Sequence, residues 1–219
     1  MKWLMTAGMA VVMVSCSDGN DGTSNRNLDS SNHSAHDSAT MPHSMDTSGM
    51  AGKSMMSMMD GMMKNMMSIR STGNPDNDFA AMMKAHHMGA IEMAQMEVAK
   101  GTDAQVKQMA QKMIDEQQKE VAELNTFLTG HAAHGGGDAF HKEAMGIMNN
   151  MKMEMDHSGS IDKQFVQMMI PHHQSAIDMS RAYIKSGAHE EKLKTMANHI
   201  IASQEKEIKE LQEWLNKAK

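Results

Sequence analysis

The amino-acid sequence predicts an all-α fold, an antiparallel four-helix bundle assembled from two duplicated helical hairpins. The first observation is a repeat, because a segment that begins at Phe79 and contains two adjacent histidines recurs at Phe165, at a constant offset of 86 residues. The second is an apolar period of three to four residues through both copies, which is typical of an amphipathic helix. The third is a glycine inside each copy, Gly101 and Gly187, which suits the end of one helix and a short turn to the next. One hairpin cannot bury its apolar face alone, so two of them predict a bundle.

The first 15 residues have the features of an export signal. Lys2 precedes a short apolar run, residues 3–14, which cannot span a bilayer but fits the hydrophobic region of a signal peptide. A small residue then precedes Cys16, the single cysteine of the chain, as in the cleavage site of bacterial lipoproteins. We therefore predict an exported bacterial lipoprotein that is lipidated on Cys16, anchored at a membrane, and facing the periplasm or the cell exterior. A secretory signal with an incidental cysteine is the alternative.

The segment between the signal and the repeats has two parts. Residues 16–54 are rich in Ser, Asp, Asn, Gly and His without an apolar period, which predicts a flexible tether. Residues 55–70 are methionine-rich, and methionine doublets begin at positions 55, 58, 62 and 66, which is a helical spacing. Two interpretations stay open: closely spaced thioethers that hold a soft metal ion, or a pliable packing surface.

The predicted helical bundle covers residues 76–217. Its hairpins are expected over residues 76–129 and 161–217, joined by a connector over residues 130–160. Within the connector, residues 138–156 have the composition of a further helix, which we expect to cross the end of the bundle.

Two local signals refine these helices. Thr102 with Gln105 resembles a capping box that opens the second helix of the first hairpin. Pro171 falls inside the first helix of the second hairpin, where it predicts either a kink that opens space beside the histidines or a break in the helix.

Each copy places its two histidines beside methionines. A thioether and an imidazole four residues apart lie one helical turn from each other, so both can bind one soft metal ion. Cu(I) accepts both ligand types, whereas Mg²⁺ and Ca²⁺ prefer oxygen, so copper as Cu(I) is the favoured ligand, with Cu(II) or Ag(I) as alternatives. A purely structural layer of histidines is the competing interpretation. The candidate metal ligands are Met82, Met83, His86, His87 and Met93 in the first copy, and Met168, Met169, His172, His173 and Met179 in the second.

Two glutamines interrupt the apolar stripes of the returning helices. Counting back from the turns places Gln117 at the height of His87, and Gln204 at the height of His173. A buried amide needs hydrogen-bond partners. We therefore expect Gln117 and Gln204 to hydrogen-bond the imidazoles and fix their tautomers, as groups behind metal ligands do.

Composition argues against two other classes of function. The formal net charge is −6 and there is no basic stripe, so nucleic acid is not an expected partner. Di-iron bundles carry Glu-x-x-His on their core helices, and here that spacing occurs at Glu154 and His157, inside the connector. No complete catalytic constellation is found, and we do not expect an enzyme.

The second copy closely resembles a known family. The stretch "DKQFVQMMIPHHQSAIDM", followed by Gly187 and "ANHIIASQEKEIKELQEWL", is similar to the family called domain of unknown function 305, and the first copy is a second, looser match. The resemblance covers roughly residues 76–216. It implies a ferritin-like helical bundle and metal roles for the matching methionines and histidines, because its CopM-type members are exported copper-binding proteins that protect cells from copper. The first copy departs from the pattern, since Ala85 stands where the second has Pro171.

These observations together predict an extracytoplasmic, lipid-anchored copper-binding protein that sequesters or hands over Cu(I) or Cu(II) for copper tolerance or homeostasis. The expected partners are the metal ion, the membrane through the lipid anchor, and copper-transport or efflux proteins. The first alternative is a methionine-rich interaction module without metal. A ferritin-like metal oxidase is the least favoured.

Overall fold

The computed structural model describes residues 52–132, 135, 137–151 and 159–218, all within one compact unit, residues 43–219. In this part of the chain every regular element is a helix, which confirms the predicted all-α helical bundle. The predicted signal peptide, Cys16 and nearly all of the predicted tether lie outside the described residues, as do Glu154 and His157. Within the described ranges, each helix is too short or too polar to cross a lipid bilayer.

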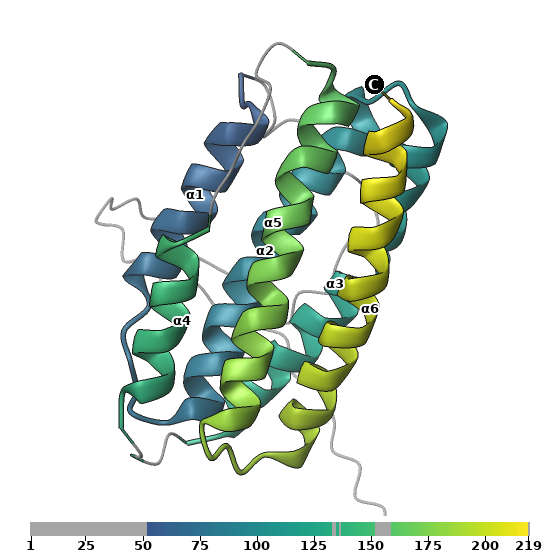
Figure 1. The fold of residues 1–219 in the computed structure, drawn as a ribbon. Helices are drawn as coiled ribbons and strands as arrows, with labels where there is room; N and C mark the ends of the chain where they lie inside the picture. Colours follow the sequence, from purple (N-terminus) through teal and green to yellow (C-terminus); the bar gives the residue numbers. More distant parts are fainter. Residues whose placement is uncertain (1–51, 133–134, 136, 152–158, 219) are drawn as a thin grey trace, which may run out of the picture. The chain divides into compact units, whose positions relative to one another are not determined.

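Four long helices form two hairpins, and a short helix precedes each hairpin (Figure 1). The elements are α1 (Met55–Ser68), α2 (Pro75–Lys100), α3 (Ala104–Gly130), α4 (Ala139–Asn149), α5 (Ile161–Lys185) and α6 (Glu191–Lys217). The predicted hairpin over residues 76–129 corresponds to α2 and α3, and that over residues 161–217 to α5 and α6. The α5 helix continues through Pro171, so the helix is not broken there.

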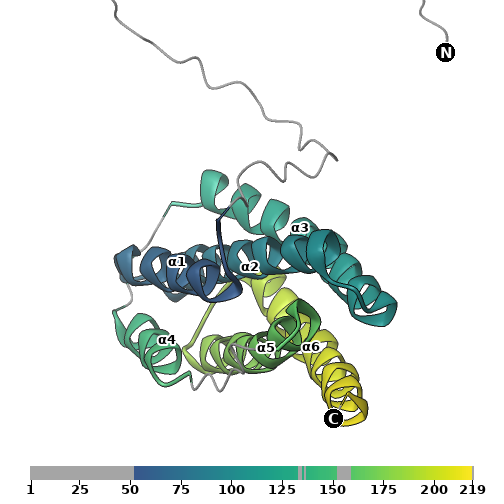
Figure 2. The same ribbon diagram turned by 90° about the horizontal axis from the view of Figure 1, so that it is seen from above.

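The central pair of the bundle is α2 and α5, which pack against each other. On one side α3 packs on α2 and α6 packs on α5, and on the other side α1 and α4 cover the same pair. Seen from above, α1, α2 and α3 lie in one row and α4, α5 and α6 in the other (Figure 2). The duplicated unit in space is therefore a short helix followed by a hairpin, which is one helix more than the sequence repeat indicates.

The connector helix differs from its prediction. It spans Ala139–Asn149 instead of residues 138–156, and it packs along α5 and α2 instead of crossing the end of the bundle. Its buried side chains, Phe140, Ala144 and Met148, recur every four residues, so they form a stripe that is buried only if the helix lies lengthwise on its neighbours.

The helix starts follow from short polar side chains. Ser54 and Ser57 form a reciprocal capping box at α1. At α3 the cap is Asp103, whose side chain accepts hydrogen bonds from the backbone N–H groups of Gln105 and Val106, so the predicted capping box of Thr102 and Gln105 is wrong. The Thr102 hydroxyl instead donates to Asp162, 3.0 Å away on α5.

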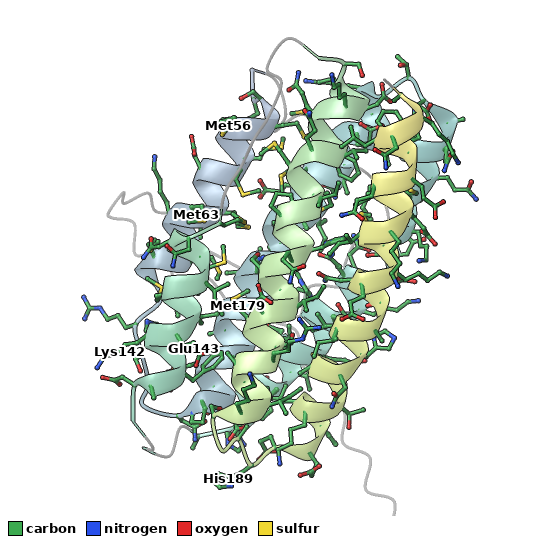
Figure 3. The ribbon with its side chains drawn as sticks, viewed as in Figure 1. Met56, Met63, Lys142, Glu143, Met179 and His189 are labelled. Carbon is green, nitrogen blue, oxygen red and sulfur yellow. The ribbon has the colours of Figure 1, made fainter. Side chains whose placement is uncertain are left out.

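The buried face of α1 consists only of methionine. Its buried residues are Met55, Met58, Met59, Met62 and Met66, each at most 3% exposed. Figure 3 shows sulfur atoms gathered between α1 and the central helices, and labels the half-buried Met56 and Met63 on α1. Fully burying one such side chain contributes roughly 1.5–3 kcal/mol. The methionine-rich segment is therefore a packed helix in the described structure.

The two hairpins hold each other through reciprocal carboxylates. Asp162, in the first turn of α5, accepts hydrogen bonds from the backbone N–H groups of Thr102 and Asp103, at 2.8 and 2.7 Å. Its counterpart Asp76, in the first turn of α2, accepts from the N–H groups of His189 and Glu190 at 3.2 Å each. Each hairpin thus begins with a carboxylate that accepts hydrogen bonds from free backbone N–H groups in the turn of the other hairpin. Because the start of each of α2 and α5 lies at the end of the other, the two helices are antiparallel.

One position differs between these two junctions. Tyr183 donates its hydroxyl proton to Asp76 at 2.6 Å, and the equivalent residue in the first hairpin is Glu97. Burial and then the charge of Asp162 raise the pKa of Glu97 to about 8, so its carboxyl is protonated at neutral pH. A side chain at Gly101 would collide with this carboxyl, which explains the glycine at the end of α2.

Glu97 predicts a pH dependence of stability. The folded state retains the Glu97 proton up to about pH 8, whereas the unfolded chain loses it near 4.5, so stability falls as the pH rises through this interval. Replacing Glu97 by Gln removes that ionisation. Thermal unfolding followed by circular dichroism from about pH 5 to about pH 9 should show a smaller loss of melting temperature in E97Q than in wild type. The exposed Glu213→Gln is the matched control and should follow wild type; identical pH profiles for wild type and E97Q would contradict the assignment.

Candidate metal site

Four histidines form a layer across the middle of the bundle, and all four are 0% exposed. Adjacent residues on a helix point about 100° apart, so each doublet divides between two directions. His86 and His172 face each other across α2 and α5, with ring centroids 3.7 Å apart and an interplanar angle of 35°. His87 and His173 face the second helix of their own hairpins, α3 and α6.

The proton position on His86 follows from its partner. Ser175 donates its hydroxyl hydrogen to the carbonyl oxygen of His172 at 2.7 Å, so its oxygen is left to accept a hydrogen bond. His86 Nε2 lies 2.8 Å from that oxygen and must carry the proton. The lone pair of His86 therefore lies on Nδ1, which is buried and has no hydrogen-bond partner among the described residues.

The partner of His172 is a thioether. His172 Nε2 lies 3.2 Å from the sulfur of Met62, on α1. A thioether can accept but not donate, so the proton of His172 is also on Nε2, and its buried Nδ1 likewise has no partner in the described structure.

A glycine makes room for this thioether. An ideal Cβ on Gly89 would lie 2.5 Å from Cγ and 2.8 Å from Sδ of Met62, so only glycine lets α1 approach α2 this closely. Gly89 is the counterpart of Ser175 at the repeat offset of 86. The two halves therefore complete the same position differently: Ser175 supplies a hydroxyl to His86, and Met62 fills the space over Gly89 to reach His172.

Burial keeps the central pair neutral. Loss of solvent, followed by the neighbouring histidines, holds the pKa values of His86 and His172 well below the usual value. Both rings are therefore uncharged at neutral pH and offer a nitrogen lone pair without competing protonation. Buried imidazole lone pairs beside thioethers are a donor set that fits a soft metal ion.

The outer histidines contact carboxylates. His87 Nε2 lies 2.8 Å from Glu120 Oε2, and His173 Nε2 lies 3.1 Å from Glu207 Oε2, although neither contact has the alignment of a full hydrogen bond. Burial alone would raise the pKa of both carboxyls, but the contacts with the histidines outweigh it and hold them below the usual value. Both carboxylates are thus ionised beside a buried imidazole.

The predicted role of the glutamines is not what the structure shows. Gln117 and Gln204 are buried near the histidines' level, but both amide atoms of Gln117 and the Oε1 atom of Gln204 have no hydrogen-bond partner among the described residues. Glu120 and Glu207, three residues further along each helix, contact the imidazoles in their place. Their negative charge makes them stronger partners for an imidazole N–H than a neutral amide.

The predicted methionine ligands all lie in the core. Met82, Met83, Met93, Met168, Met169 and Met179 are each at most 1% exposed. The sulfur that the structure places in hydrogen-bonding geometry with an imidazole, however, is that of Met62, which the sequence analysis did not assign to the site. Among the described residues, no three His, Cys, Asp or Glu side chains are placed together to hold a metal ion.

Comparison with known proteins identifies the family. The family described as "Domain of unknown function (DUF305)" matches residues 6–128 and again residues 129–215. The chain belongs to this family. Its two matches divide the DUF305 chain into the same halves as the structure, each with a short helix and a hairpin, and they confirm the resemblance found in the sequence.

Proteins similar to this chain include a viral sequence and two solved structures. The "Uncharacterized protein L153" of Acanthamoeba polyphaga mimivirus is 41% identical over 58 residues, which are 26% of this chain and 38% of that protein, so the match spans well under half of its length. A structure of CopM in the Ag-bound form, obtained by soaking, is similar with a TM-score of 0.51 and 28% identity, covering 65% of this chain and 95% of that chain. A DUF305 fragment from Deinococcus radiodurans has a TM-score of 0.49 and 19% identity, covering 65% and 96%.

The contact of Met62 with Gly89 predicts a coupled mutational effect. In Gly89→Ala the added methyl group collides with Met62, which should destabilise the protein by about 1–3 kcal/mol in urea denaturation. Met62→Ala in the same chain removes the collision, so the double variant should lose less stability than the sum of the two single variants. Gly61→Ala, on the half-exposed face of α1 with no atom within 4 Å of the new methyl group, is the control and should not destabilise. Strict additivity of the G89A and M62A losses would show that the two residues do not meet.

Proposed function

We propose that this protein binds a soft monovalent metal ion, Cu(I), in the core between α1, α2 and α5. The ligands are the imidazoles of His86 and His172 and the thioether of Met62, with the other buried methionines of the repeats as further sulfur donors. The observation that carries the proposal is the buried contact of 3.2 Å between His172 Nε2 and Met62 Sδ. An ion held by both atoms would take the place of the Nε2 proton, which would move to the unpartnered Nδ1 of the same neutral ring.

The donor set supports copper more than a hard or borderline ion. Thioether sulfur selects soft ions, and imidazole accepts copper in both oxidation states. Without a cysteine after the first 16 residues, methionine is the available sulfur ligand. Similarity to CopM, which has been solved with silver bound, points the same way, because Ag(I) is a soft monovalent ion like Cu(I).

We further propose the physiological role that the sequence suggests. The protein would be a lipoprotein anchored through Cys16 outside the cytoplasm, where it sequesters Cu(I) or hands it to copper-transport or efflux proteins as part of copper tolerance. Storage or transfer requires reversible binding and no catalytic step, so no acid–base or redox residue is needed. Met82, Met83, Met168 and Met169 would give the ion alternative thioether partners along the core.

The thioether of Met62 provides the direct test. Met62→Leu keeps the volume and apolar character of the side chain but removes the sulfur. We expect this variant to weaken Ag(I) and Cu(I) binding by about tenfold or more, measured by titration against a competing chelator. Met67→Leu is the matched control, since Met67 lies on the same helix but is 38% exposed, and should bind as wild type does.

Thermal unfolding separates metal binding from packing alone. A ligand that binds only the folded state raises its stability, by about 2.7 kcal/mol at a concentration of 100 times Kd. Wild type should therefore melt at a higher temperature with Ag(I) or Cu(I), and M62L should lose most of that increase. A melting temperature that does not respond to either ion would overturn the proposal and favour a methionine-rich interaction module.

A further inference from the structure

A chain of side chains leads from the protein surface to one of the buried histidines. His199, on α6, has a side chain that is 68% exposed, and its Nδ1 lies 3.3 Å from Glu120 Oε1. The other oxygen of Glu120 lies 2.8 Å from Nε2 of His87, which is 0% exposed. One carboxylate, itself 13% exposed, therefore joins a solvent-exposed imidazole to a buried one.

The second hairpin repeats this chain with one residue changed. Glu207 lies 3.1 Å from His173, as Glu120 does from His87, and its other oxygen lies 3.3 Å from the ammonium group of Lys112. Lys112 is the counterpart of His199 at the offset of 87 residues. The ammonium group of Lys112 has no lone pair and neutralises Glu207, so a cation cannot bind there. At the equivalent position, the imidazole of His199 offers a nitrogen donor beside Glu120.

The surface around His199 leaves room for a hydrated ion. A cavity of about 670 Å³ is lined by His199, by the carboxylates of Glu116, Glu120 and Glu123, and by Lys119 and Lys192, so its carboxylates outnumber its ammonium groups. Carboxylates and an imidazole are therefore exposed to the same volume of solvent. The corresponding surface at Lys112 is a cavity of about 430 Å³ whose lining includes Glu210 but no histidine.

We infer that His199 and Glu120 form a surface site for a borderline divalent cation, with Cu(II) as the strongest ligand, separate from the core site for soft ions. Imidazole with carboxylate suits such ions, and Cu(II) stands at the top of the affinity order for divalent first-row metals. The ion takes the imidazole nitrogen of His199 and an oxygen of Glu120 as protein ligands and water for the rest. The shared carboxylate places this ion one residue from the buried His87.

The internal repeat supplies a reciprocal test. His199→Lys places a lysine beside Glu120, as Lys112 lies beside Glu207. Lys112→His places a histidine beside Glu207, as His199 lies beside Glu120. Cu(II) titration of the full-length protein by calorimetry, with electron paramagnetic resonance to detect nitrogen ligation, should give one equivalent fewer in H199K and one more in K112H. Other histidines contribute equally to wild type and variants. In NMR spectra, Cu(II) should broaden amide signals around residue 199 in wild type and not in H199K.

The outcomes separate this site from the core. Unchanged stoichiometry and broadening in H199K, or failure of K112H to add an equivalent, would overturn the surface site. Ag(I) binding should be the same in H199K as in wild type, because the soft site does not use His199. Absence of Ag(I) binding to wild type, together with a Cu(II) stoichiometry that falls in H199K and rises in K112H, would contradict the proposed core site and support the surface site.

Discussion

The four imidazoles buried between antiparallel helices govern how the two hairpins must pack. An imidazole without solvent must be neutral or must face a carboxylate, and this protein uses both solutions. His86 and His172 stack on each other as neutral rings. His87 and His173 face Glu120 and Glu207. Each hairpin therefore has to bring a carboxylate on its returning helix to the height of its histidines.

Duplication gives the bundle an approximate symmetry, and both proposed metal sites lie where that symmetry is broken. Ser175 stands where the other half has Gly89, so His86 contacts a hydroxyl and His172 contacts a thioether. Because His199 stands where the other half has Lys112, Glu120 contacts an exposed imidazole and Glu207 an ammonium group. A symmetric bundle would have two equal sites of each kind, whereas the single substitutions at these positions give each half its own chemistry.

The two junctions at the ends of the bundle also differ at one equivalent position. Asp76 and Asp162 join each hairpin to the turn of the other, and both are satisfied by two backbone N–H groups. Tyr183 completes one junction with a neutral hydroxyl, while Glu97 stands at the other with an ionisable carboxyl. Burial and the bond to Asp76 raise the pKa of Tyr183, so its hydroxyl stays neutral, whereas the other junction depends on the proton of Glu97.

The helical class, the repeat and the histidine doublets can be read from the sequence, because periodicity and duplication are local properties of the chain. It located the hairpins and the methionine-rich helix, and it identified the DUF305 family. Three contacts become evident only in the folded bundle: Met62 reaches His172, Glu120 and Glu207 replace the expected glutamines, and Thr102 binds Asp162. These contacts join residues 60 to 110 positions apart, or depend on a difference of three residues along one helix. The helical period fixes the face on which a side chain lies. The residue that it contacts there depends on how closely two helices approach, and Gly89 allows the close approach of α1 to α2.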